Sequence, residues 1–120
     1  MGGEAFPRSE RLTSAEEFQT VFQRGARIDR PSVLLLWREG PGRRKAGFAV
    51  SRQIGGAARR NRARRRIREA YRVSRRRLPE GVQLVVVARL RAATGPYGEI
   101  LQDMREGLDA VAKRCRQGGA

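Results

Sequence analysis

A dense run of arginines between Arg43 and Arg77 is the most distinctive feature of this sequence. The segment holds fifteen basic residues and one acidic residue, Glu69, and so carries nearly all of the formal net charge of +15. Guanidinium groups bind phosphates in a planar, bidentate geometry and also stack on bases. Charges of one sign at this density repel one another unless a polyanion screens them. The segment therefore predicts a nucleic-acid-binding surface.

The spacing of residues between 57 and 77 predicts a long helix that carries these arginines. One narrow stripe at helical spacing consists of Ala63, Ile67, Ala70, Tyr71 and Ser74, as expected of a helix face that packs on a core. With that stripe turned inward, the outward positions are Asn61, Arg65, Arg68, Arg72 and Arg76, and the flanking positions are Arg62, Arg64 and Arg75. The predicted helix is apolar on one side and cationic on the rest.

A basic helix can also be merely exposed to solvent, lie on a membrane surface or recognise DNA. The first two roles fit this segment less well than binding to a nucleic acid. A merely solvated face usually alternates both signs of charge, so that neighbouring turns form ion pairs, and Glu69 alone cannot supply them. A membrane-surface helix would carry bulky Trp, Phe and Leu on its apolar face. DNA recognition stays open on charge alone, because arginine is also the commonest reader of guanine.

The sequence offers no candidate catalytic or metal site. It contains no histidine and one cysteine, Cys115, which excludes a His/Cys zinc site and a disulfide within one chain and suits a reducing, cytoplasmic location. Asp103 and Glu106 lie one turn apart on a predicted surface helix, where we expect them to act as solvating charges. Residues 1–11 lack the apolar stretch of a secretory signal. The run Val33–Trp37 falls far short of the roughly 20 residues that span a bilayer, so we expect a soluble protein.

The N-terminal half predicts a helix and two strands. Thr13-x-x-Glu16 and Ser14-x-x-Glu17 read as capping boxes, after which Phe18, Val21 and Phe22 follow at helical spacing until Gly25. The stretch Ile28–Trp37 is interrupted by Pro31, which indicates an edge strand or a bend between two short strands. A turn at Gly40-Pro41-Gly42 then leads to a strand at Ala46–Val50, which we expect to pair antiparallel with the preceding one.

The C-terminal half completes an α/β domain in the order α-β-β-α-β-α. The nearly continuous apolar run Val82–Ala88 predicts a strand that is buried on both faces in a parallel pairing, and with the preceding helix it suggests a βαβ unit. A final helix begins after Thr94-Gly95-Pro96. We predict one domain over residues 1–120, folded from about 11 to 115, with short flexible tails at both ends.

The stretch Phe48–Tyr71 closely resembles the signature of the bacterial ribonuclease P protein subunit. Its core, Arg60-Asn61-Arg62 followed by Arg64-Arg65 and Arg68, is similar to the RNR motif of that family. The likeness extends to Glu17-Phe18, Phe22 and Arg24-Gly25, to the strands at Val33 and at Val82–Arg89, and to the last helix. It covers most of the chain, from about Arg11 to Lys113.

This resemblance implies both a fold and a reaction. The fold is a small α+β sandwich in which a mixed β-sheet is flanked by helices, and the RNR helix lies in a left-handed βαβ crossover. Residue patterns alone would predict the usual right-handed sense. The reaction is the endonucleolytic removal of the 5′ leader from precursor tRNA, in which the protein is the accessory subunit of a catalytic RNA. Mg²⁺, bound mainly by the RNA subunit and the substrate, would activate water, and the protein would supply no catalytic residue.

The resemblance also implies two sets of binding residues. The set that would contact the catalytic RNA is Arg52, Arg59, Arg60, Asn61, Arg62, Arg64, Arg65 and Arg68. The set that would line a groove for the leader, between the first helix and the sheet, is Phe18, Phe22, Phe48 and Ser51. The implied partners are the catalytic RNA and precursor tRNA, with no membrane, no DNA and no required protein oligomer.

Several alternatives stay open on the residues. The spacing of Phe18 and Phe22 by itself favours ordinary core packing, although one ring can be packed while another is exposed. The sequence departs from the family pattern at Gln53, Gly56 and Leu36, which puts one phosphate contact and part of the aromatic stacking in doubt. A ribosomal or other structural RNA-binding protein could use the same helix. A DNA-binding regulator would need a second helix where a strand is predicted after Pro79.

Overall fold

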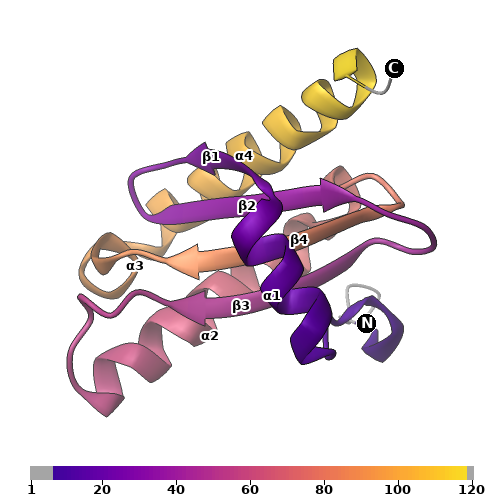
Figure 1. Ribbon diagram of the computed structural model, residues 1–120. Coiled ribbons are helices and arrows are strands. Elements are labelled where there is room, and N and C mark those ends of the chain that lie inside the picture. The colour runs from indigo at the N-terminus through magenta and orange to yellow at the C-terminus, as the bar shows by residue number, and fades with distance from the viewer. Residues whose placement is uncertain (1–6, 119–120) are drawn as a thin grey trace.

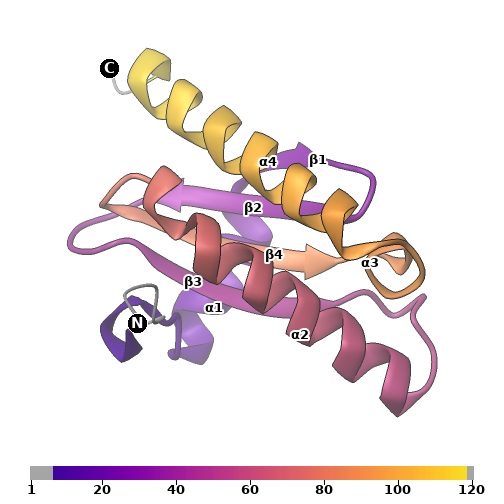
Figure 2. The same cartoon turned by 180° about the vertical axis from the view of Figure 1, so that it is seen from behind.

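A four-stranded mixed sheet separates one helix from two longer ones (Figures 1 and 2). Residues 7–118 are the part of the chain that this computed structural model describes. The strands are β1 (Ala26–Asp29), β2 (Val33–Glu39), β3 (Lys45–Val50) and β4 (Val82–Ala88), in the spatial order β1-β2-β4-β3. The helices are α1 (Ala15–Arg24), α2 (Ala57–Ser74), α3 (Leu90–Thr94) and α4 (Tyr97–Gly118), with 3₁₀ helices at Arg8–Glu10 and Arg75–Arg77.

The two faces of the sheet bury separate apolar clusters. The larger cluster lies between the sheet and the helices α2 and α4, and the smaller one lies between the sheet and α1. β4 contributes to both, because its side chains alternate between the faces and most are fully buried. The expectation of a sandwich of helices around a mixed sheet is confirmed.

The partner of β3 differs from the sequence expectation. β1 and β2 form the antiparallel hairpin, with Pro31 in the turn between them, which confirms the prediction of two short strands. β3 does not pair with β2; it pairs in parallel with β4, which lies between them and runs antiparallel to β2. The predicted antiparallel pairing of the second and third strands is therefore wrong. The most apolar strand, β4, takes one of the two central places, where both of its edges are hydrogen-bonded.

The connection β3–α2–β4 is left-handed. In Figure 2 α2 lies between the viewer and the sheet, β3 and β4 both run to the right, and β4 lies above β3. A right-handed crossover would place β4 below β3 in this view. The unusual sense implied by the family resemblance is confirmed, against the general preference for right-handed connections.

α2 buries the stripe that its sequence predicts. Its buried side chains are Ala63, Ile67, Ala70, Tyr71 and Ser74. The arginines of the helix lie on its other sides and face outward. Gly56 caps the helix with a φ of +83°, a value that glycine adopts without strain. Arg75 is the exception to the predicted pattern. It lies almost completely buried against Glu10 of the N-terminal 3₁₀ helix, an element for which the sequence showed no signal.

The predicted first and last helices are both present. The Ser14 side chain accepts a hydrogen bond from the Glu17 N–H at 3.3 Å, which caps α1 as expected. On α4 the expectation for Asp103 is wrong, because its carboxylate is buried and accepts hydrogen bonds from the Ser32 hydroxyl and N–H at 2.6 and 2.9 Å. These hydrogen bonds fix α4 to the turn between β1 and β2. Within residues 7–118 no helix has the length and apolar composition needed to cross a bilayer.

Candidate nucleic-acid interface

Basic residues of the arginine-rich segment divide into two groups by their partners. The first group lies beside carboxylates: Arg43 and Arg75 with Glu10, Arg44 with Glu80, Lys45 with Glu17, Arg72 with Glu69, and Arg77 with Asp109. The hydrogen bond from Arg72 holds the pKa of Glu69 below its usual value, so this carboxylate is charged at neutral pH. These residues lie just before β3, at its first residue, or in and after the last turn of α2, and their charge is largely neutralised within the protein.

The second group has no ion pair with any carboxylate of residues 7–118. Its members are Arg52, Arg59, Arg60, Arg62, Arg64, Arg65, Arg66, Arg68 and Arg76. All seven arginines that the motif assigns to RNA contact belong to it. Uncompensated positive charge is therefore concentrated on the first two thirds of α2 and on the loop before it, although the sequence distributes arginines along the whole helix. We call this region, Arg52 to Arg68, the cationic surface.

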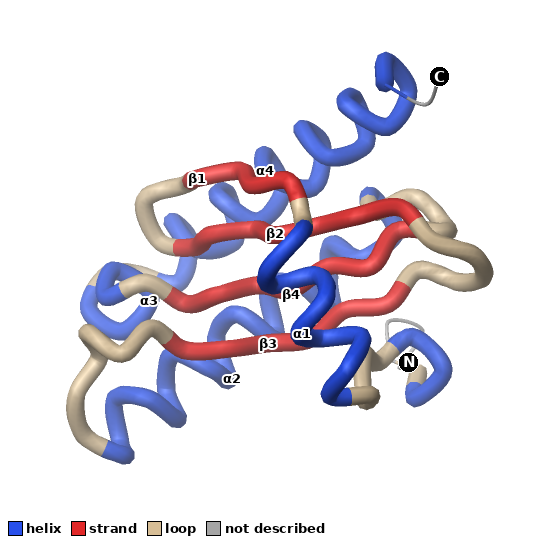
Figure 3. The backbone as a smooth tube through the Cα atoms, viewed as in Figure 1, coloured by secondary structure: helices blue, strands red, loops and turns tan. Residues whose placement is uncertain are grey.

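Two guanidinium groups of the cationic surface also hold the backbone in place. Nη1 of Arg60 donates to the carbonyl oxygens of Ser51 and Ile54, at 3.2 and 3.1 Å. Arg60 therefore fastens the loop between β3 and α2 (Figure 3) to the helix. Nη1 of Arg66 donates to the carbonyl oxygens of Ala92 and Gly95, around α3. Arg66 was not among the predicted site residues, and the spacing of arginines gives no means to tell it from its neighbours.

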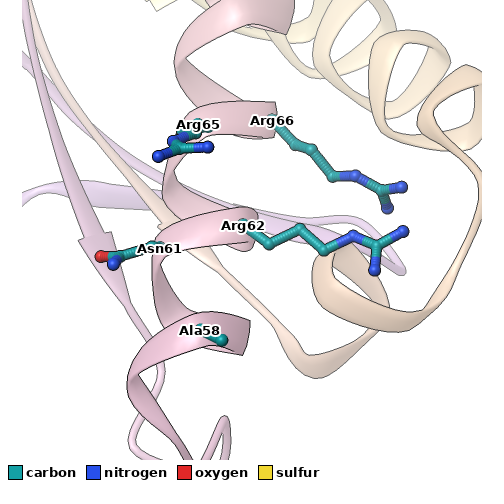
Figure 4. A pocket seen from close by; sticks show the side chains of 5 residues that line it. All are labelled: Ala58, Asn61, Arg62, Arg65 and Arg66. Atoms are coloured by element: carbon teal, nitrogen blue, oxygen red, sulfur yellow. The ribbon is translucent and has the colours of Figure 1, made fainter.

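The outer face of α2 is hollowed where the motif residues lie. A hollow of about 430 Å³ is lined by Ala58, Asn61, Arg62, Arg65 and Arg66. Figure 4 shows Arg62 and Arg66 extending side by side from one flank of the helix, while Asn61 and Arg65 extend from the other. The small Ala58 side chain leaves room between the two pairs. Guanidinium groups on both sides of a recess can hold phosphate oxygens of a strand that lies across the helix.

A second candidate surface lies on the α1 face of the sheet. The rings of Phe18 and Phe22 stack with centroids 6.3 Å apart. Phe18 is half-buried over Gly47, where an added Cβ would lie 3.1 Å from the ring, whereas Phe22 is 47% exposed. One ring is thus packed and the other open to solvent. Leu36, one of the departures from the family pattern, is buried in the cluster beneath this helix.

Phe48 lies on the opposite face of the sheet from Phe18. Because side chains alternate along a strand, Gly47 faces α1 and Phe48 faces α2. There the Phe48 ring meets Tyr71 edge-on, with centroids 5.8 Å apart, and the Arg68 guanidinium lies over it at 5.9 Å. The structure therefore does not bring Phe48 together with the other residues expected in the leader groove. Ser51 follows the end of β3, and its hydroxyl accepts a hydrogen bond from the Gln53 N–H at 3.2 Å.

A family model described as "Ribonuclease P" matches residues 6–112 of this chain. Two curated relatives, both described as a ribonuclease P protein component, come from Kocuria rhizophila and Streptomyces avermitilis. The first is 36% identical over 110 residues, which cover 91% of this chain and 97% of the relative. The second is 36% identical over 124 residues, which cover 95% of this chain and 98% of the relative.

Solved structures of the same kind of protein share the fold. The RNase P protein of Staphylococcus aureus superposes with a TM-score of 0.72 at 23% identity, over 87% of this chain and 95% of that one. The RNase P protein of Thermotoga maritima also gives a TM-score of 0.72, at 24% identity over 84% and 96%. The likeness covers nearly the whole length of both proteins, so it extends to the sheet and its helices together.

Proposed function

The chain belongs to the ribonuclease P protein family, which acts in tRNA processing, and from this membership we propose that it binds the catalytic RNA of ribonuclease P and the 5′ leader of precursor tRNA. The protein is then the accessory subunit of an endoribonuclease that generates the mature 5′ end of tRNA in the cytoplasm. The observation that carries the proposal is the separation between the cationic surface and the neutralised end of α2.

The cationic surface is the proposed docking face for the catalytic RNA. Each arginine without a carboxylate partner can neutralise a phosphate and release the counterion that the phosphate held, which favours binding. An arginine already paired with a carboxylate must first give up that partner, so it contributes less. Asn61 lies among these arginines and can add a hydrogen bond to a base or a ribose.

The α1 face is the proposed place of the leader. Unpaired bases stack on aromatic rings beside a cationic track, and each stacked base stabilises the complex by about 1–3 kcal/mol. Phe22 offers such a ring to solvent, and Phe18 supports it from below. Ser51 lies at the end of β3, where the sheet continues into the loop held by Arg60. Phe48 faces α2 and lies apart from these rings, so this proposal leaves it out of the leader groove.

Catalysis in this proposal belongs to the RNA. Mg²⁺, held by the catalytic RNA and the substrate, would activate the attacking water and stabilise the leaving oxygen. No group of three or more His, Cys, Asp or Glu side chains that could hold a metal ion lies within residues 7–118. In this proposal the part of the protein's own residues is to bind and orient the two RNAs.

The proposal can be tested with the full chain, a bacterial ribonuclease P RNA and precursor tRNA at low Mg²⁺. We expect the protein to increase the rate at which mature 5′ ends form, and the double variant Arg62→Ala/Arg65→Ala to lose most of that gain. A structural RNA-binding protein would bind RNA without any gain in processing. Binding without an increased rate would thus reject the processing role and favour that competing function.

A further inference from the structure

A small hollow lies at the outer edge of β3. Its volume is about 240 Å³, and its lining residues are Arg11, Leu12, Thr13, Ala46, Gly47, Phe48, Arg64 and Arg68. They come from three separate segments: the chain before α1, strand β3 and helix α2. The N-terminal segment is held there by a parallel bridge between Arg11 and Ala46 and by a hydrogen bond from the Leu12 N–H to the Ala46 carbonyl oxygen at 2.9 Å.

One side of the hollow is apolar and the other is cationic. Leu12 and Ala46 are almost fully buried beneath it, and the half-buried Phe48 ring forms its wall. Arg64 and Arg68 extend from α2 on the other side, and neither has an ion pair with a carboxylate of residues 7–118. The Arg68 guanidinium lies over the Phe48 ring, 5.9 Å from its centroid. The hollow thus joins an aromatic surface to cations that are not neutralised within the described chain.

A single-stranded nucleotide has the matching pair of chemical properties. Its base is flat and stacks on aromatic rings or guanidinium planes, and its phosphate binds arginine. The hollow has a volume of about 240 Å³, below the roughly 300–1,000 Å³ that is usual for sites enclosing a drug-sized ligand, so it can take one base with the rest of the nucleotide outside. A paired stem would offer phosphates to the arginines but no base to the apolar side.

We propose that this hollow binds one unpaired nucleotide of the catalytic RNA, with its base against Phe48 and its phosphate on Arg64 and Arg68. The inference rests on the proposed function, since Arg64 and Arg68 belong to the cationic surface that the catalytic RNA would cover. It favours the catalytic RNA over the leader because Phe48 lies on the opposite face of the sheet from Phe18. Phe48 is then a specificity contact for an unpaired position in the RNA.

The test replaces the ring of Phe48 while keeping apolar volume against Tyr71, as in Phe48→Leu. The full-length variant is mixed with the ribonuclease P RNA of Kocuria rhizophila, without tRNA, and its affinity and the chemical reactivity of each ribose 2′-hydroxyl are measured. Loss of one stacked base predicts roughly tenfold weaker binding and renewed reactivity of one unpaired nucleotide that the original protein protects. Thermal denaturation checks that the variant is folded.

Three further variants keep the test decisive if Phe48→Leu is unstable. Arg64→Ala lies in the same hollow and should expose the same nucleotide, whereas Arg76→Ala, an exposed residue outside the hollow, should leave its protection intact. Phe22→Leu removes an aromatic ring on the other face and should not change this footprint. Protection of that nucleotide that survives both Phe48→Leu and Arg64→Ala would overturn the inference.

Failure of the inference can be told apart from failure of the proposed function. A protein that does not bind the catalytic RNA at all contradicts the proposed function and, with it, the nucleotide site. A protein that binds with unchanged footprints in both hollow variants contradicts only the nucleotide site. The same measurement is therefore repeated with precursor tRNA present. A change of reactivity in the leader, with none in the catalytic RNA, would assign the hollow to the leader and overturn the inference as stated.

Discussion

The Arg75 guanidinium lies against the Glu10 carboxylate, and its Nη1 donates to both carboxylate oxygens at 2.9 and 3.1 Å. Both side chains are almost completely buried. Glu10 ends the 3₁₀ helix before α1, and Arg75 begins the one that follows α2. The pair therefore fastens the N-terminal segment, which walls the hollow beside Phe48, to the end of the helix that carries the cationic surface.

Removing one partner of this pair should destabilise the protein strongly. Glu10→Ala leaves the Arg75 charge buried, and uncompensated charges of this kind cost about 3–5 kcal/mol. Arg43, 3.8 Å from Glu10, is itself a cation and cannot serve Arg75 as a partner in place of the carboxylate. Urea denaturation gives the free energy of unfolding, with the exposed Glu16→Ala as control. A destabilisation below about 1 kcal/mol, typical of an exposed pair, would contradict this account of the ion pair.

Arg60→Ala should affect both folding and RNA binding. Its guanidinium donates to the carbonyl oxygens of Ser51 and Ile54, and hydrogen bonds that involve a charged group contribute about 1.5–3 kcal/mol. Arg65→Ala, on the exposed face of the same helix, should weaken RNA binding with little change in thermal stability. Equal melting temperatures for the two variants would show that the loop does not depend on Arg60.

The salt dependence of RNA affinity should distinguish the two groups of arginines. The slope of log K against log[salt] is negative, and removing an arginine that neutralises one phosphate makes it less steep by about 0.7–0.9. We therefore expect Arg62→Ala/Arg65→Ala to make the slope less steep by roughly 1.5. The matched pair Arg43→Ala/Arg77→Ala, whose side chains lie beside carboxylates, should change it much less. Equal slopes in the two double variants would reject the division of the arginines by their partners.

Phe22→Ala should weaken binding of precursor tRNA and leave mature tRNA unaffected. The ring is 47% exposed and stacks on Phe18, so its removal costs little core packing. The expected effect on leader affinity is about 1 kcal/mol or more, as for one stacked base. Affinities of the holoenzyme for both substrates provide the measurement. Equal weakening for both would place Phe22 outside any leader contact.

Acid should destabilise the protein through its paired carboxylates. The hydrogen bond from Arg72 lowers the pKa of Glu69, and the hydrogen bond from the Arg44 N–H lowers that of Glu80, both from a usual value of 4.5. Their stabilising effect is therefore present above pH 4.5 and is lost as the pH falls through the lower folded values. Thermal denaturation between neutral pH and acid should show this decline. The double variant Glu69→Gln/Glu80→Gln should decline less steeply over the same range.

Elements with local causes could be predicted from the residues alone. Helical spacing identified the buried stripe of α2 from Ala63 to Ser74, and Ser14 with Glu17 marked the start of α1. The apolar run Val82–Ala88 matches β4 at both ends. The Arg60-Asn61-Arg62 motif pointed to the family. These features depend on neighbours within one or two turns, so periodicity and capping chemistry are enough to predict them.

Contacts between residues far apart in the chain could not be predicted in the same way, because they depend on how the elements pack. β4 lies between β2 and β3 and is hydrogen-bonded to both. The residue pattern of a strand predicts which face is buried, but it does not indicate which strand is the partner. Alternation along β3, once its register with β4 was set, turned Phe48 toward Arg68 and away from Phe18. Whether an arginine is neutralised depends on carboxylates far along the chain, as Glu10 is from Arg75. The count of charges was therefore visible in the sequence, whereas the part of α2 that keeps its charge for RNA was set by long-range packing.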